Sequence, residues 1–248
     1  FFNYSKMNKQ IIEHLFEFWE QIGKHGGFLR NEDGFSATYP LNNSWPSKTF
    51  GLDHNNLNID KLKDSIRTKV APNSIAIYED NTIKNILEWH QFISCSTIKA
   101  MALDTTGVFF DELDDTEFKI VNTKDEAEVF AQVASESFGY LVEASTIIPL
   151  IDKPSFKIIL GKHDEDIPTC GMVYIDKNGI AGIHMIGTKT AYRGMGLGKK
   201  MTQFLINQSV EAQTSKVFLV ASAAGERIYT KMGFTTHGAL ESYSLPLE

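Results

Sequence analysis

Cysteine is scarce in this 248-residue chain, which contains only Cys95 and Cys170. The two residues lie far apart and match no C-x-x-C spacing, so the sequence indicates neither a disulfide framework nor a zinc site. We interpret both as ordinary thiols and expect no bound metal. Long apolar runs are also missing, and the first ten residues lack the basic and then apolar layout of a secretory signal. These absences predict a cytoplasmic protein without a membrane partner.

Positive charge is in the minority, with 24 Lys and Arg residues against 31 Asp and Glu residues and a net charge of -7. This balance argues against a nucleic-acid partner. The composition, with 42% hydrophobic and 22% charged residues, is typical of folded globular proteins and excludes disordered, collagen-like and coiled-coil chains. At about 100 to 200 residues per domain, the length favours two small domains or one large one.

The first part of the chain begins with an amphipathic pattern. Its apolar residues recur at three- and four-residue steps, at Ile12, Leu15, Phe16, Trp19 and Ile22. This spacing predicts a core-facing helix that ends near Gly26. Residues 28–50 are rich in aromatic residues, Asn, Gly, Ser and Pro, which predicts short strands and ordered loops. The acidic patch at residues 111–115 indicates a linker, so we expect an α/β domain over residues 1–115 and a second domain over residues 116–248.

The second part gives clearer signals. Residues 118–121 favour a strand, and Thr123 with Glu126 forms a capping box that opens a helix through about Phe138. The tripeptide at 177–179 is a tight-hairpin signal between strands at 169–175 and 180–188. A long amphipathic helix is expected from about Gly196, followed by an apolar strand at 217–221, a short helix at 223–232 and closing strands over 234–245.

A glycine-rich segment stands between a predicted strand and a predicted helix, with Gly194, Gly196 and Gly198 at alternate positions. Such a turn leaves backbone N–H groups uncovered at the positive end of a helix, which suits a phosphate group. The alternative is a turn that only permits close helix packing. A Walker loop is excluded because positions 193 and 200 are Arg and Lys, and the dinucleotide fingerprint is excluded by the glycine spacing.

The pattern Arg193-x-x-Gly196-x-Gly198 matches the R/Q-x-x-G-x-G/A signature of the GNAT superfamily of N-acetyltransferases, and the sequence resembles that family from about 117 to 245. A second element, which ends in Tyr229-Thr230-Lys231-Met232-Gly233-Phe234, is similar to the family's N-x-x-A-x-x-L-Y-x-x-x-G-F motif. It departs from that motif with Ser222 in place of Asn and Gly225 in place of Ala. The resemblance implies an α/β (α+β) fold with a mixed, mostly antiparallel sheet flanked by helices.

The resemblance also implies acetyl-CoA as co-substrate. The amides of Met195 to Lys199 would cradle the pyrophosphate, Arg193 would add positive charge, and the strand end at 186–188 would lie along the pantetheine arm and offer an N–H group to the thioester carbonyl. The residues expected to contact the cofactor are Ile186, Thr188, Arg193, Gly194, Met195, Gly196, Leu197, Gly198, Lys199 and Ser222.

Tyr229 matches the family's proton donor, because a phenol is protonated at neutral pH and can give its proton to the CoA sulfur. The alternative is that Tyr229 is a core aromatic residue without a catalytic role. His184 is the candidate general base, and Glu143 and Glu226 are further candidates for this role. The alternative is that His184 is only a packed residue of its strand.

The predicted function is transfer of an acetyl group from acetyl-CoA to a primary amine of a small molecule or a protein, by a monomer or homodimer. The alternative is a non-catalytic acyl-CoA-binding sensor or interaction protein. We expect residues 1–115 to cover the acceptor end of the site. Their aromatic residues would either line a pocket or belong to the core; these are Phe35, Tyr39, Trp45 and Phe50.

Overall fold

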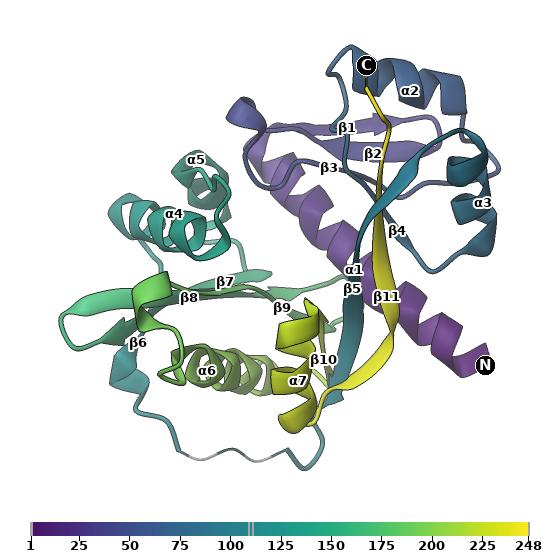
Figure 1. The fold of residues 1–248 in the computed structure, drawn as a ribbon. Helices are drawn as coiled ribbons and strands as arrows, with labels where there is room; N and C mark the ends of the chain where they lie inside the picture. Colours follow the sequence, from purple (N-terminus) through teal and green to yellow (C-terminus); the bar gives the residue numbers. More distant parts are fainter. Residues whose placement is uncertain (1, 109, 111, 248) are drawn as a thin grey trace. The chain divides into compact units, whose positions relative to one another are not determined.

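The computed structural model describes residues 2–108, 110 and 112–247 and shows a mixed α/β fold (Figure 1). The chain forms two compact units. The terminal unit comprises Phe1–Met101 and Val220–Glu248, and the central unit comprises Ala102–Leu219. The last segment of the chain therefore groups with the first hundred residues. None of the helices in the described part of the chain is long and apolar enough to cross a membrane.

The terminal unit combines four helices with six strands among its described residues. Its helices are α1 (Phe2–Gly26), α2 (Ile59–Arg67), α3 (Asn81–Trp89) and α7 (Ala223–Lys231), with a 3-10 turn η1 (Leu41–Asn43). Its strands are β1 (Leu29–Glu32), β2 (Phe35–Thr38), β3 (Lys48–Phe50), β4 (Ile75–Tyr78), most of β5 (Ile93–Asp104) and β11 (Thr235–Ser244), in the sheet order β1-β2-β3-β4-β11-β5. The pair β3 and β4 is parallel, whereas β1–β2, β2–β3 and β4–β11 are antiparallel.

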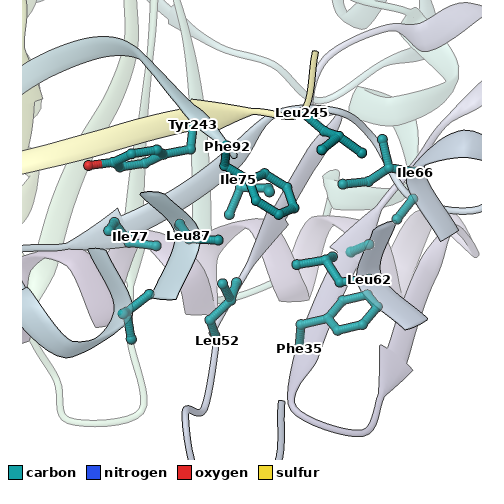
Figure 2. Packing of buried hydrophobic residues seen from close by; sticks show 13 residues of the cluster. Phe35, Leu52, Leu62, Ile66, Ile75, Ile77, Leu87, Phe92, Tyr243 and Leu245 are labelled. Atoms are coloured by element: carbon teal, nitrogen blue, oxygen red, sulfur yellow. The ribbon is translucent and has the colours of Figure 1, made fainter. Parts of the chain in front are cut away.

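The core of the terminal unit joins segments that are distant in the sequence. Figure 2 shows Ile75 and Ile77 of β4 in one cluster with Tyr243 of β11 and Leu62 of α2, and each of these side chains is almost fully buried. Burial of such apolar side chains stabilises the fold by roughly 1.5 to 3 kcal/mol each. The helix predicted from residues 12–22 is confirmed as α1, which ends at Gly26.

Two of the four aromatic residues that could have lined a pocket are buried in the core. Phe35 and Phe50 are 3% and 2% exposed, so for these two the core alternative holds. Phe50 packs against the rings of Phe16 and Trp19, at centroid distances of 5.4 and 5.6 Å. Trp45 lies 6.0 Å from the ring of Phe18.

The central unit contains a smaller set of strands between helices. Its elements are η2 (Asp115–Glu117), β6 (Phe118–Ile120), α4 (Lys124–Phe138), α5 (Ala144–Ile147), η3 (Ile148–Leu150), β7 (Phe156–His163), β8 (Asp166–Ile175), β9 (Ala181–Thr188), η4 (Thr190–Tyr192), α6 (Leu197–Glu211) and most of β10 (Lys216–Ala221). The sheet order is β10-β9-β8-β7-β6, and only the recorded β9–β10 pairing is parallel. Figure 1 shows α4 and α5 on one face of these strands and α6 on the other.

Glycine permits close packing on both faces of the central strands. A Cβ on Gly187 of β9 would stand 2.8 Å from the Cβ of Ser137 in α4. A Cβ on Gly171 of β8 would stand 2.7 Å from Leu205 in α6. Residue 187 therefore faces α4, and residue 171 faces α6. This assignment of faces places the neighbouring side chains of the candidate site.

Several local predictions for the second part are confirmed. The capping box of Thr123 and Glu126 opens α4, and the predicted hairpin joins β8 to β9. The short helix predicted at 223–232 is α7, and Gly233 follows it with a φ of 100°. The prediction of more than one closing strand is wrong, because β11 runs unbroken from Thr235 to Ser244 although Gly238 has a φ of 84° within it.

Candidate active site

The glycine-rich turn between β9 and α6 is open to a ligand. Gly194 and Gly196 have φ angles of 80° and 79°, a left-handed conformation that glycine adopts without strain. A Cβ on either residue would meet nothing within 4 Å. At Gly198, by contrast, a Cβ would stand 3.3 Å from the Thr188 hydroxyl. The close-packing alternative therefore fits Gly198, whereas Gly194 and Gly196 shape an open turn.

The start of α6 presents backbone donors at this turn. Gly196 is the N-cap of the helix and offers no side chain to its amides. The amides of Leu197, Gly198 and Lys199 occupy the first three helical positions, where no carbonyl of the same helix can accept them. The partial positive charge of the helix N-terminus adds to these donors, so the turn suits a phosphate group.

Two of the three cations near the turn have protein partners. The guanidinium of Arg193 donates to the backbone carbonyls of Ser137 and Thr188, at 2.7 and 3.3 Å. It thereby ties the last turn of α4 to the end of β9. The ammonium of Lys200 lies 3.0 Å from the Glu117 carboxylate, whereas Lys199 is exposed. Arg193 thus has a structural role beside the turn, and its charge remains at that position.

The strand that leads to the turn carries a β-bulge. Thr188, Gly187 and His184 of β9 pair with β8, and the register shifts between Gly187 and His184. Within this shifted segment, Met185 has a φ of 54°. On its other side, β9 pairs with β10 at Ala181 and Gly182. Ile186 and Thr188 lie beyond this paired stretch and are half-buried. A backbone free of strand pairing at that edge could hydrogen-bond an extended ligand arm.

His184 lies on the α4 face of the strands. His184 pairs with Met172 of β8, and Gly187, which faces α4, pairs with Cys170. Met172 and Cys170 are two positions apart on β8 and therefore lie on the same face. Side chains of directly paired residues project to the same face of a sheet. His184 is only 7% exposed. The histidine is therefore a buried strand residue on the face that α4 covers.

Sequence reasoning missed an aromatic pair beside the bulge. Tyr140 follows the left-handed C-cap Gly139 of α4, and its ring stacks on Phe138 at a centroid distance of 5.4 Å. The Tyr140 hydroxyl lies 3.9 Å from the Met185 Sδ. Burial raises the pKa of this phenol, which therefore stays protonated at neutral pH. No motif spacing links residues 140 and 185, so sequence alone carried no signal for this contact.

The other predicted residues belong to the terminal unit. Tyr229 lies on α7, where its ring packs edge-on against Phe234 at 5.8 Å. A Cβ at position 225 would stand 3.2 Å from that ring, closer than an ordinary contact. Ser222 is the N-cap of α7 and accepts the Gly225 N–H at 3.3 Å. The departures from the family motif thus have local roles in this helix.

The two acidic residues that are further candidates for the base lie in different surroundings. The Glu226 carboxylate accepts a hydrogen bond from the Thr236 hydroxyl at 2.9 Å. Glu143 occupies the N-cap position of the short helix α5. No group of three or more His, Cys, Asp or Glu residues in the described part of the chain is arranged to hold a metal ion.

Comparisons with known proteins agree with this arrangement. Residues 122–242 match the family model described as an acetyltransferase (GNAT) domain. No curated protein matches the chain.

Solved structures share the fold along most of the chain. A GCN5-related N-acetyltransferase from Kribbella flavida has a TM-score of 0.69 and 16% identity, covering 89% of this chain and 90% of its own. A putative GNAT-family acetyltransferase from Novosphingobium aromaticivorans has a TM-score of 0.59 and 11% identity, with coverage of 91% and 94%. A GCN5-related N-acetyltransferase from Sphaerobacter thermophilus has a TM-score of 0.58 and 14% identity, with coverage of 85% and 76%.

The family match contains both motifs that carried the resemblance, since Arg193 and Tyr229 lie within residues 122–242. The predicted fold class is also confirmed, because the mixed α/β fold with its mostly antiparallel sheet is shared with GNAT proteins along most of the chain. The motifs and the family model therefore agree that residues 122–242 are similar to a GNAT acetyltransferase domain.

Proposed function

We propose that the protein transfers an acetyl group from acetyl-CoA directly to a primary amine of a small molecule or a protein. The observation that carries this proposal is the turn before α6, where two left-handed glycines with open space beside them precede the first helical amides. A turn that served packing alone would bring atoms close to both glycines. The GNAT match over the same residues supports acetyl-CoA as the ligand.

The central unit supplies the binding contacts in this proposal. The amides of Met195 to Lys199 hold the pyrophosphate, and Arg193 adds positive charge beside it. The pantetheine arm runs along Ile186 to Thr188, which lie beyond the β9–β10 pairing. One N–H group of this segment donates to the thioester carbonyl and stabilises the oxyanion that forms during transfer.

The reaction then needs no covalent enzyme intermediate. The neutral amine nitrogen attacks the thioester carbon, and the carbon–sulfur bond breaks. Tyr229 gives its proton to the departing CoA sulfur, and the proton lost by the amine passes to His184 or to water. The phenol is then reprotonated from solvent. The role of Tyr229 rests on its position in the second motif, and that of His184 rests on its place on β9.

The proposed reaction is tested by CoA release from acetyl-CoA in the presence of a panel of primary amines, detected with a thiol reagent. We expect release that depends on at least one amine and an acetylated product of matching mass. Binding of acetyl-CoA without amine-dependent release across small amines and lysine peptides would instead support the acyl-CoA-binding sensor.

Replacement of His184 tests the proposed base. We expect His184→Ala to lower kcat and to remove the ascending limb of the pH–rate profile near neutral pH, because a general base must be unprotonated to act. The exposed His54→Ala variant serves as the control for loss of a histidine. An unchanged pH–rate profile in His184→Ala would assign the proton transfer to water or to another group.

A further inference from the structure

The bulge in β9 gives the central unit an irregular peptide group at the candidate acyl position. Between the pairs Cys170–Gly187 and Met172–His184, two residues of β9 oppose one residue of β8. Such a bulge interrupts the ladder and redirects the backbone locally. Met185 has a φ of 54°, a conformation that side chains other than glycine rarely adopt. A neighbouring contact must therefore stabilise this backbone.

The Cys170 side chain makes that contact. Its thiol donates to the Met185 carbonyl at 3.4 Å, and its sulfur accepts the N–H of Gly187. One side chain thus satisfies a backbone acceptor and a backbone donor on either side of Ile186. The sulfur is also within packing distance of residue 187, since a Cβ there would lie 3.2 Å from it. Cys170 is fully buried and holds the bulge from the α4 face.

This contact sets the direction of the next N–H group. The peptide bond between Met185 and Ile186 is trans, because the cis peptide bond among the described residues is the one between Trp45 and Pro46. In a planar trans peptide the carbonyl and the N–H point in opposite directions. Because the Met185 carbonyl points at the Cys170 thiol, the Ile186 N–H points away from it. Ile186 lies beyond the residues of β9 that pair with β10.

We propose that Cys170 is a positioning residue, which locks the β9 bulge so that the Ile186 N–H donates to the thioester carbonyl of bound acetyl-CoA. This inference rests on the proposed function, and it selects one donor among the residues 186–188. The cysteine acts through the backbone and does not touch the reacting atoms. A side chain that both donates and accepts is required, because the bulge exposes one carbonyl and one N–H group to it.

The protonation state of Cys170 suits this role. Burial raises the pKa of the thiol to about 12, against a smaller opposing effect of the Gly187 N–H. The thiol therefore keeps its proton at neutral pH and can donate it to the Met185 carbonyl. A thiolate would lose that donor. The same burial makes Cys170 a poor nucleophile, which agrees with direct transfer to the amine.

The test uses acetyl-CoA labelled with carbon-13 at the thioester carbonyl and added to the full-length protein. A hydrogen bond to the carbonyl oxygen moves the carbon resonance downfield from its position in free acetyl-CoA. Cys170→Ala and Cys170→Val remove both hydrogen bonds, and the second variant keeps the space filled. Cys170→Ser keeps a donor and an acceptor. Cys95→Ser is the matched control, because Cys95 is exposed.

We expect a downfield displacement in the parent, Cys95→Ser and Cys170→Ser, and loss of at least half of it in Cys170→Ala and Cys170→Val. Calorimetric affinity for acetyl-CoA should remain near the parent value in all variants, because the phosphate contacts lie on the turn before α6. Full displacement in either folded apolar variant would overturn the proposal. So would acetyl-CoA that binds the parent without any displacement.

These outcomes separate the inference from the proposed function. If the parent binds acetyl-CoA but its carbonyl resonance does not move, the positioning role fails while cofactor binding stands. If the parent does not bind acetyl-CoA, the proposed function fails, and the positioning role fails with it. Far-ultraviolet circular dichroism and thermal unfolding show which variants are folded and therefore count in the comparison.

Discussion

Replacing Tyr229 by Phe is expected to lower kcat by about 10²- to 10⁴-fold, the usual contribution of a general acid, and to leave acetyl-CoA binding intact. The substitution removes one hydroxyl group and keeps the ring that packs against Phe234. The CoA thiolate would then depart without a positioned proton. Steady-state rates of amine-dependent CoA release, together with calorimetric titration of acetyl-CoA, measure the two effects separately.

Tyr243→Phe is the matched control, because Tyr243 also belongs to the terminal unit, where its ring is part of the core and its hydroxyl donates to the Glu88 carboxylate at 3.4 Å. We expect its turnover to equal that of the parent. Equal turnover in Tyr229→Phe would remove the phenol from the mechanism and leave Tyr229 as a half-buried aromatic residue that packs against Phe234. Loss of acetyl-CoA binding in Tyr229→Phe would also contradict a role confined to proton transfer.

Replacing Asn8 by Ala is expected to lower the free energy of unfolding by about 3 kcal/mol, since two backbone groups lose their partner and each such loss costs roughly 1 to 3 kcal/mol. The Asn8 amide nitrogen donates to the Ala239 carbonyl at 3.1 Å, and its oxygen accepts the Glu79 N–H at 3.1 Å. Asn8 is 1% exposed. A single side chain thus joins α1, the end of β4 and β11.

Denaturant unfolding measures this loss, with Gln10→Ala as the control on the exposed side of the same helix. The control should change the free energy of unfolding by less than about 0.5 kcal/mol. An equally small change in Asn8→Ala would show that water replaces both hydrogen bonds at little cost.

Local sequence signals predicted local structure well. The capping box placed the start of α4, because its two reciprocal hydrogen bonds join residues only three positions apart. The hairpin between β8 and β9 was predicted from the Gly179 turn, and the Asp176 side chain adds hydrogen bonds to Asn178 and Ile180 that the turn signal does not include. Such features depend on neighbouring residues, so the sequence contains them directly.

Long-range pairing could not be predicted in the same way. The closing strand β11 pairs with β4, with Leu240 opposite Tyr78. A segment of alternating apolar residues predicts that a strand will form, but it does not predict which distant strand will pair with it. For this reason the grouping of Val220–Glu248 with the first part of the chain has no signal in the local pattern.

In the candidate site, too, the local feature could be predicted from the sequence and the long-range contact could not. The turn from Arg193 to Lys199 is one continuous segment, so its glycine spacing predicted the open turn that the structure has. The bulge at Met185 and its contact with Cys170 depend on the register between two strands and on the packing of α4. Interpreting Cys170 as an ordinary thiol followed from composition and spacing, which carry no information on register.

Calorimetric titration of acetyl-CoA into the parent, Gly196→Glu and Gly179→Glu proteins tests whether the turn before α6 binds the cofactor. Gly196 and Gly179 have φ angles of 79° and 73°, and a Cβ on either meets nothing within 4 Å, so the two substitutions carry the same backbone strain and charge. We expect the parent and Gly179→Glu to bind acetyl-CoA and Gly196→Glu not to bind it. Equal binding by Gly196→Glu, or no binding by the parent, would contradict the assignment of this turn as the acetyl-CoA site.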